Sequence, residues 1–171
     1  MTCIVKSYFF NKMQDDFDAF NPENFEDDSD PISFHIEEIE FELSEPQKFT
    51  EWIESTASAE GKSISAVNFI FCSDEYLYQM NMDYLQHDTY TDVITFPYSS
   101  PEDSYIEGDI FISVERTAEN ARKFGVSPEI ELHRVMIHGV LHLIGYDDKS
   151  PAKKKIMTAK EDEYLAKLLL V

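Results

Sequence analysis

One helix of this chain must lie inside the folded domain, because it is apolar around almost its whole circumference. Its apolar residues are Val135, Met136, Ile137, Val140, Leu141, Leu143 and Ile144. The run 127–129 (serine, proline, glutamate) supplies an N-cap, a first-turn proline and an acidic residue. Gly145 follows the last apolar residue and suits the left-handed position after a helix end. We therefore predict a buried helix that ends at Ile144, with other elements packed on several sides.

Two histidines interrupt this apolar surface, His138 and His142. Side chains four residues apart project from the same face of a helix, so one cation could contact both imidazoles. A buried imidazole needs hydrogen-bond partners, and two of them on one face indicate a common use. The chain that returns after Gly145 can bring Asp148 to them. Three protein ligands with a fourth position open are typical of a catalytic zinc site.

Other residues near the pair have weaker claims. Zinc proteases carry a glutamate as general base directly after the first histidine, where this chain has Gly139. Peptide hydrolysis is therefore a minor alternative, and we expect another backbone or a substrate to approach that glycine closely. His133 is expected to be a surface group or to support a ligand. Asp147 and Asp92 could orient the site, or simply form a turn and cap a strand.

The rest of the sequence alternates between strand and helix patterns. Strands are predicted at 32–43, 64–72, 93–96 and 108–114, an irregular loop at 98–107, and helices at 46–59, 74–84, 115–124, 128–144 and from 151 on. In the last helix, Ile156, Tyr164, Leu165 and Leu168 are expected to face the domain. The pattern predicts a single layered α/β (α+β) domain, with a roughly four-stranded mixed sheet and a buried helix that binds metal.

Residues 1–31 differ from the rest of the chain. Residues 11–31 are acidic, with scattered phenylalanines and no steady period, so we expect an acidic, disordered N-terminal extension to a domain spanning 32–171. No apolar run is long enough to cross a membrane. With only Cys3 and Cys72 present, a disulfide is not expected, and we predict a cytoplasmic protein.

The net charge of −20 argues against a general attraction to nucleic acid. The only cluster of cations is formed by Lys153, Lys154 and Lys155, which we expect to be a solvated face of the last helix. An acidic surface could instead contact basic ribosomal proteins.

Three ordered blocks of the sequence resemble the YbeY family of bacterial endoribonucleases. Residues 138–148 (HGVLHLIGYDD) are similar to the family pattern HGxLHLxGYDH, in which three histidines bind metal. Residues 91–97 (TDVITFP) resemble its TDVLSFP block, and residues 108–113 (GDIFIS) resemble its GDI-x-I-S block. The resemblance covers about 32–170. It implies a metal-dependent endoribonuclease specific for single strands, which acts in small-subunit ribosomal RNA maturation and ribosome quality control.

The same resemblance implies one zinc ion per chain, held by His138, His142 and Asp148. Its implied partners are single-stranded or ribosomal RNA and the ribosomal proteins or small subunit. The chain departs from the family pattern twice: Asp148 stands where a third histidine is expected, and Leu85 where the family usually has an arginine. Aspartate remains a zinc ligand but adds a negative charge. Arg116 and Arg134 are the candidates to replace the arginine, although both fit structural ion pairs.

Two alternative functions stay open at this point. One is a ribosome-assembly factor that acts through protein partners with little catalysis of its own. The other is a zinc hydrolase of a different bond, such as a peptide bond. The sequence leaves the oligomeric state open.

Overall fold

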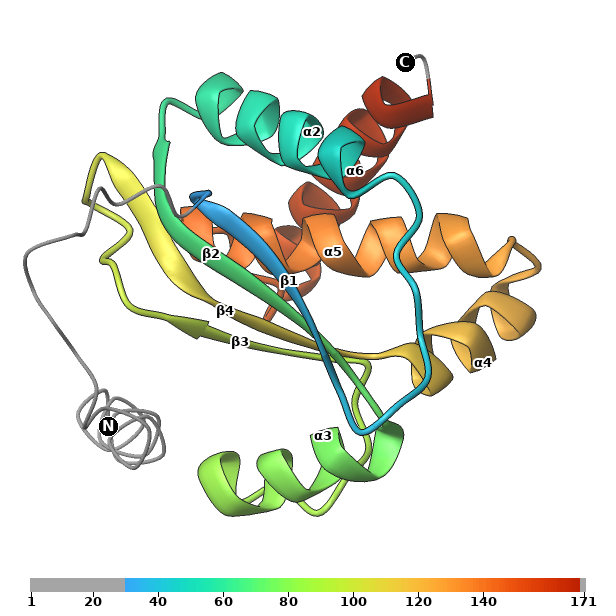
Figure 1. Cartoon of the computed structure of the whole chain (residues 1–171). Helices are drawn as coiled ribbons and strands as arrows, with labels where there is room; N and C mark the ends of the chain where they lie inside the picture. Colours follow the sequence, from blue (N-terminus) through green and yellow to red (C-terminus); the bar gives the residue numbers. More distant parts are fainter. Residues whose placement is uncertain (1–29, 170–171) are drawn as a thin grey trace, which may run out of the picture. The chain divides into compact units, whose positions relative to one another are not determined.

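A four-stranded mixed sheet organises the fold, which a computed structural model describes for residues 30–169 (Figure 1). The strands are β1 (Ile32–Glu37), β2 (Ser63–Cys72), β3 (Val93–Pro97) and β4 (Tyr105–Ser113). They lie in the order β1-β2-β4-β3; the first three are parallel, and β3 runs antiparallel to β4 at one edge. The predicted α+β domain with a mixed sheet of four strands is confirmed.

The helices begin and end close to where the sequence predicts. They are α2 (Pro46–Ala59), α3 (Asp74–Met80), the π-helical turn η2 (Asn81–Leu85), α4 (Val114–Phe124), α5 (Pro128–Ile144) and α6 (Pro151–Leu169). The Ser73 hydroxyl accepts a hydrogen bond from the Tyr76 amide at 3.1 Å, and the Ser127 hydroxyl one from the Ile130 amide at 3.3 Å. Both serines are therefore N-caps, which confirms the cap predicted at Ser127. The predicted helix 74–84 is α3 continued by η2.

Helix α5 lies at the centre of the core. It contacts β3 and β4 of the sheet, and it also contacts α2, α4 and α6 (Figure 1). Met136, Ile137, Val140 and Leu141 have no exposed surface, as expected for a helix that is apolar on all sides. A Cβ atom on Gly139 would lie 2.6 Å from Cγ2 of Ile110 in β4, so only glycine allows this packing distance. The close approach predicted at this residue is therefore made by a sheet side chain, not by backbone or substrate.

The opposite face of the sheet is covered in part by α3 and η2. Leu77 and Met80 are buried there, and the ring of Tyr84 lies edge-on to Phe96 with ring centroids 6.1 Å apart. This packing sets the position of the segment that follows η2, which runs towards β3 and the site described below.

Several predicted boundaries are wrong for identifiable reasons. β1 ends at Glu37, because Glu38 takes a left-handed backbone conformation (φ 56°) and turns the chain. The alternation that continues to Leu43 reflects packing without strand pairing: Phe41 lies against Phe71 with ring centroids 4.9 Å apart. β4 begins at Tyr105, inside the predicted loop. Ile156 is 54% exposed, and its neighbour Met157 is buried instead.

The predicted acidic extension, residues 1–31, falls almost entirely outside the described residues, as does Cys3. Cys72 is fully buried as a free thiol. Burial, together with nearby carboxylates, raises the pKa of this thiol to about 12, so it is unreactive at neutral pH. None of the helices in residues 30–169 has the length and apolar character needed to cross a membrane.

Candidate metal centre

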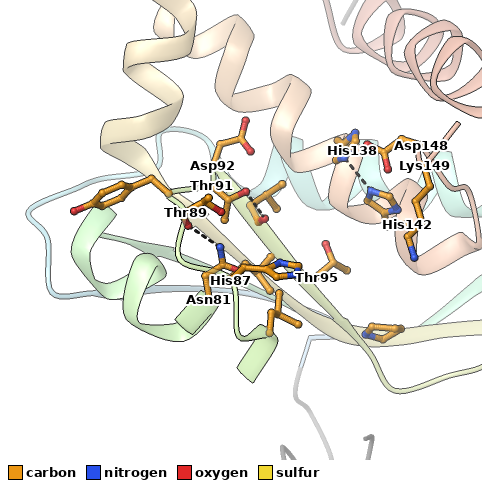
Figure 2. Close-up of a pocket in the computed structure, with 15 residues that line it drawn as sticks. Asn81, His87, Thr89, Thr91, Asp92, Thr95, His138, His142, Asp148 and Lys149 are labelled. Carbon is orange, nitrogen blue, oxygen red and sulfur yellow. Dashed lines mark hydrogen bonds between the residues drawn. The ribbon is translucent and has the colours of Figure 1, made fainter. Parts of the chain in front are cut away.

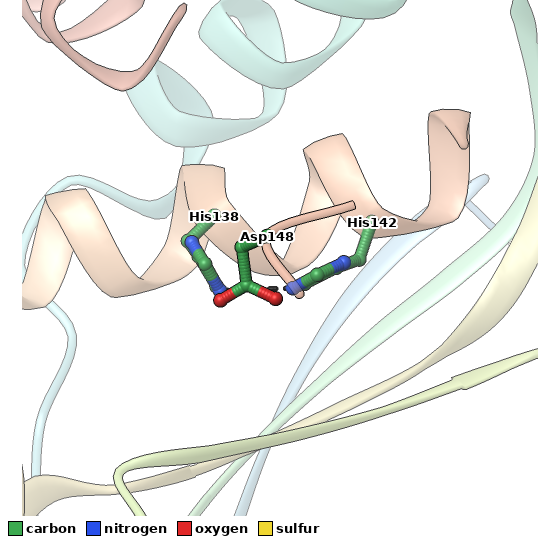
Figure 3. A group of neighbouring side chains, drawn as sticks. All are labelled: His138, His142 and Asp148. Atoms are coloured by element: carbon green, nitrogen blue, oxygen red, sulfur yellow. Dashed lines mark hydrogen bonds between the residues drawn. The ribbon is translucent and has the colours of Figure 1, made fainter. Parts of the chain in front are cut away.

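The side chains of His138, His142 and Asp148 meet at the C-terminal part of α5 (Figure 3). The two Nε2 atoms are 2.9 Å apart, and each of the three residues offers a ligand atom within 4.8 Å of the others. All three are partly buried. The structure thus brings together the three residues that the sequence singled out.

A turn at the end of α5 returns Asp148 to the two histidines. Gly145 has φ 115°, a left-handed conformation that glycine adopts without strain. The amides of Gly145 and Tyr146 both donate to the Leu141 carbonyl, at 3.1 and 2.9 Å, and close the turn. The glycine at this position is therefore a condition for the third residue to reach the pair.

The second ring nitrogen of each histidine is held by an acceptor. Nδ1 of His138 lies 2.7 Å from Oε1 of Glu161 on α6, and Nδ1 of His142 lies 3.0 Å from the Tyr146 carbonyl oxygen. Burial would raise the pKa of Glu161, but its hydrogen bonds and charge interactions with His138 and Arg134 outweigh this and lower it. Glu161 is therefore an ionised carboxylate that only accepts.

These contacts fix the tautomer of both rings. A carbonyl and a carboxylate cannot donate, so each Nδ1 carries a hydrogen, and Nε2 is the nitrogen left to bind a metal when the ring is neutral. If both rings are neutral, their Nε2 lone pairs face each other across 2.9 Å, and either a bound cation or a shared proton removes the repulsion. Burial above all, and then His138, lower the pKa of His142, which favours the neutral imidazole that a metal needs.

The donor set fits a zinc ion. Two imidazole nitrogens bound to one tetrahedral zinc at roughly 2.0–2.1 Å lie about 3.3 Å apart, close to the 2.9 Å between these Nε2 atoms. A carboxylate oxygen as the third ligand matches sites with two histidines and one acid. Glu161 takes the place of the carboxylate that commonly orients a metal-binding histidine.

Sequence reasoning missed Glu161, which lies 23 residues after His138. A signal was present: Glu161 falls on the same face of α6 as the buried residues Met157, Tyr164 and Leu165. An acidic residue on an otherwise apolar helix face needs a partner inside the domain.

The two arginines considered as phosphate contacts are both engaged in ion pairs. Arg134 binds Glu161 at 3.0 Å and Asp162 at 2.7 Å. Arg116 binds Asp74 and Glu119. The expected structural role of both is confirmed.

The remaining candidates lie around the site in different roles. Asp147 accepts from the Lys149 amide at 2.9 Å and pairs with Lys153 at 2.8 Å, which lowers its pKa to about 2 and marks it as a turn former. Asp92 accepts from the Asn120 amide group at 3.0 Å. Lys153 is thus engaged with Asp147, while Lys154 and Lys155 are exposed, as expected for a solvated helix face.

His133 was expected at the surface or beside a ligand, and the structure leaves it partly exposed. Its ring packs against Phe49 and Trp52 with centroids 4.8 and 6.4 Å apart. Burial lowers its pKa, and its Nδ1 is buried with no hydrogen-bond partner among residues 30–169. His133 therefore serves the packing between α2 and α5.

Two hollows meet at the cluster. The larger, of about 630 Å³, lies between α5, the edge strand β3 and the segment after η2 (Figure 2). Its wall includes Leu85, 43% exposed, and the basic residues His87 and Lys149. The smaller, of about 350 Å³, lies between α4, α5 and α6. His138 and Asp148 line both, so the cluster sits at their junction.

Fold and site together define a class of protein: a mixed four-stranded α+β domain whose central helix ends in two histidines and a returning acid. The sequence model of the family described as Endoribonuclease YbeY matches residues 29–169. The chain belongs to this YbeY family.

Individual relatives agree with this membership. The chain is 50% identical to Endoribonuclease YbeY of Flavobacterium johnsoniae over 135 residues, covering 79% of this chain and 95% of that one. It is 52% identical to Endoribonuclease YbeY of Flavobacterium psychrophilum over 134 residues, covering 78% and 94%. The solution structure of a protein from Thermotoga maritima superposes with a TM-score of 0.56 at 29% identity, covering 80% of this chain and 88% of that one.

Proposed function

We propose that this protein is a zinc-dependent endoribonuclease that cuts single-stranded RNA during small-subunit ribosomal RNA maturation and ribosome quality control. The observation that carries the proposal is the convergence of His138, His142 and Asp148 at the junction of two hollows. The relatives that match most of the chain are named endoribonucleases, which supports the reaction class. A buried free thiol at Cys72 suits the reducing cytoplasm, where we place the protein.

Each residue of the cluster has a defined part in the proposal. His138, His142 and Asp148 would hold the ion, and Glu161 and the Tyr146 carbonyl keep the two imidazoles in the ligand tautomer. A zinc ion held there would supply Lewis-acid polarisation of a phosphate oxygen and a lowered pKa of bound water. Lys149, which follows Asp148 and lines the larger hollow, offers a positive charge to the RNA backbone.

The size of the hollows favours a single strand as substrate. Hollows of about 630 and 350 Å³ have room for individual nucleotides, and we expect unpaired bases to enter them more readily than stacked, paired ones. Leu85 occupies the place of an expected arginine in the larger hollow, so we assign the positive charge there to Lys149.

The test uses protein without a histidine tag, loaded with zinc. We expect it to cut a single-stranded RNA and to leave the same sequence intact in a duplex. His142→Ala and Asp148→Ala should both lack activity and bound zinc. Equal cleavage by His142→Ala would trace the activity to a contaminant, and unchanged zinc in both variants would refute the ligand assignment.

A second candidate is an assembly factor that acts through ribosomal proteins. The net charge of −20 favours it, because basic ribosomal proteins attract an acidic surface more strongly than RNA does. Cleavage of purified RNA by the protein alone would exclude it; activity that requires ribosomal particles would support it. Peptide hydrolysis is disfavoured, because Gly139 packs against Ile110 where zinc proteases carry their glutamate.

A further inference from the structure

Glu131 is a largely buried residue whose carboxyl group has no hydrogen-bond partner among residues 30–169 and is open to a hollow. It lies on α5 two helical turns before His138, and only 4% of its surface is exposed. Within residues 30–169 its side chain forms no hydrogen bond and no ion pair, while nearby Arg134 is engaged with Glu161 and Asp162. Buried carboxyl oxygens normally accept hydrogen bonds. The space open to Glu131 is the smaller hollow, whose wall it forms.

The other walls of this hollow suit a flat, partly apolar group. The ring of Phe124 lines it, is 67% exposed, and stacks on no aromatic ring in the described part of the chain. Val135 and Met157 add apolar surface, and exposed Lys154 adds a positive charge. The hollow therefore combines an aromatic platform, a hydrogen-bond acceptor and a cation.

The acidic groups of this hollow do not form a second metal site. In residues 30–169, His138, His142 and Asp148 are the only group of three or more such side chains whose ligand atoms all lie within 4.8 Å of one another. Both oxygens of Glu161 are already bound, by His138 and Arg134. Glu131 therefore faces the hollow as an isolated acceptor, which calls for a hydrogen-bond donor on the ligand.

We propose that the smaller hollow binds one nucleobase next to the scissile phosphate, with the base stacked on Phe124 and its exocyclic amino group donating to Glu131. This inference rests on the proposed function, because His138 and Asp148 line the same hollow. Proteins read unpaired RNA bases in this way, by stacking on aromatic rings and hydrogen bonding to base edges. A carboxylate accepts from the exocyclic amino group of adenine or cytosine, whereas uracil has a carbonyl oxygen in that place, which cannot donate. Lys154 meets the phosphate of that nucleotide.

The test measures binding of zinc-loaded full-length protein to short 2′-O-methyl oligouridines, which resist cleavage. Each carries one adenosine, or one purine riboside that lacks only the amino group, at successive positions. We expect one position at which adenosine binds about tenfold more tightly than purine riboside or uridine. Glu131→Leu should abolish this preference, and the exposed Glu129→Leu on the same helix should keep it.

A surface variant covers the case in which Glu131→Leu fails to fold. Phe124→Ala should weaken binding of every base at that position, and Phe124→Tyr should restore it. No base preference in the wild type, or a preference unchanged in both Glu131→Leu and Phe124→Ala, overturns the inference.

Parallel cleavage assays on ordinary RNA separate this inference from the proposed function. Base-selective binding without cleavage refutes the nuclease and keeps the base-binding hollow. Cleavage without base preference keeps the nuclease and refutes base binding in the hollow, and absence of both binding and cleavage refutes both proposals.

Discussion

Helix α5 carries partly buried histidines in two different settings, and the contrast separates a packing histidine from two candidate metal ligands. His133 is clamped between Phe49 and Trp52, and its Nδ1 has no hydrogen-bond partner in the described residues. His138 and His142 each have Nδ1 held by an acceptor and Nε2 directed at the other ring. Burial alone does not distinguish the two settings. The hydrogen-bond partner of Nδ1 distinguishes them, because it fixes the tautomer of the ring and so the direction of the Nε2 lone pair.

The largest expected effect comes from removing one ring from each setting. His142→Ala should reduce zinc from one ion per chain to almost none, because two remaining ligands do not hold it. The loss of affinity should exceed the roughly 10–100-fold that removal of an outer partner causes. His133→Ala should keep one zinc per chain. Elemental analysis of tag-free protein measures the bound zinc. Equal zinc loss in His142→Ala and His133→Ala would contradict the distinction between the two settings.

The next effect concerns the acceptor behind His138. Glu161→Ala should weaken zinc binding roughly 10–100-fold, because the imidazole loses the group that orients it. Glu161→Gln keeps a hydrogen-bond acceptor, so its zinc affinity should lie between that of Glu161→Ala and that of the wild type. Asp162→Asn is the matched control, since Asp162 shares Arg134 but does not touch His138. Competition with a chromogenic chelator measures the zinc affinities. A wild-type affinity in Glu161→Ala would show that Glu161 has no part in zinc binding.

The third effect is the loss of zinc affinity at low pH. A protonated imidazole cannot bind metal, so zinc affinity should fall as pH drops, by roughly tenfold per unit for each proton taken up. Because burial and His138 lower the pKa of His142, this loss should begin below the ordinary value of about 6.5. A titration of zinc retention from pH 8 to pH 5 measures it. His133→Phe should leave the curve unchanged; a shifted curve would mean that His133 acts on the site.

The smallest effect is on the stability of the zinc-free protein. His133→Phe removes a buried nitrogen without a partner, so at pH 7.5 the variant should be about 0–1 kcal/mol more stable. Burial lowers the pKa of His133 in the folded state, so below about pH 6.5 the unfolded chain binds a proton that the folded chain does not. The wild type therefore loses stability on acidification, and the gap should widen at pH 5.5. Urea unfolding at both pH values checks this, and a narrowing gap would contradict the assigned pKa direction.

Local rules in the sequence were enough to predict the helices and the grouping of the three candidate ligands. Caps at Ser73 and Ser127 and the spacing of His138, His142 and Asp148 depend on residues close together in the chain. Hydrophobic patterning also located the four strands, because it reports burial. It could not tell a paired strand from an extended segment packed on the core, which is why β1 was predicted beyond Glu37.

Contacts between distant segments account for what sequence reasoning missed. The bond from Glu161 to His138 joins α6 to α5, and the aromatic clamp on His133 joins α2 to α5. Nothing in the sequence marks Glu131, because only the packing of the helices buries it beside a hollow. Each of these depends on which helices become neighbours, and local periodicity does not contain that information.

The bond between α6 and His138 also has a consequence for biosynthesis. A growing chain acquires both imidazoles and Asp148 before Glu161 has been added. Until α6 has left the ribosome and docked, the His138 ring lacks the acceptor that sets its tautomer. High-affinity zinc binding should therefore be among the last properties that a newly made chain acquires, after the sheet and α5 are in place.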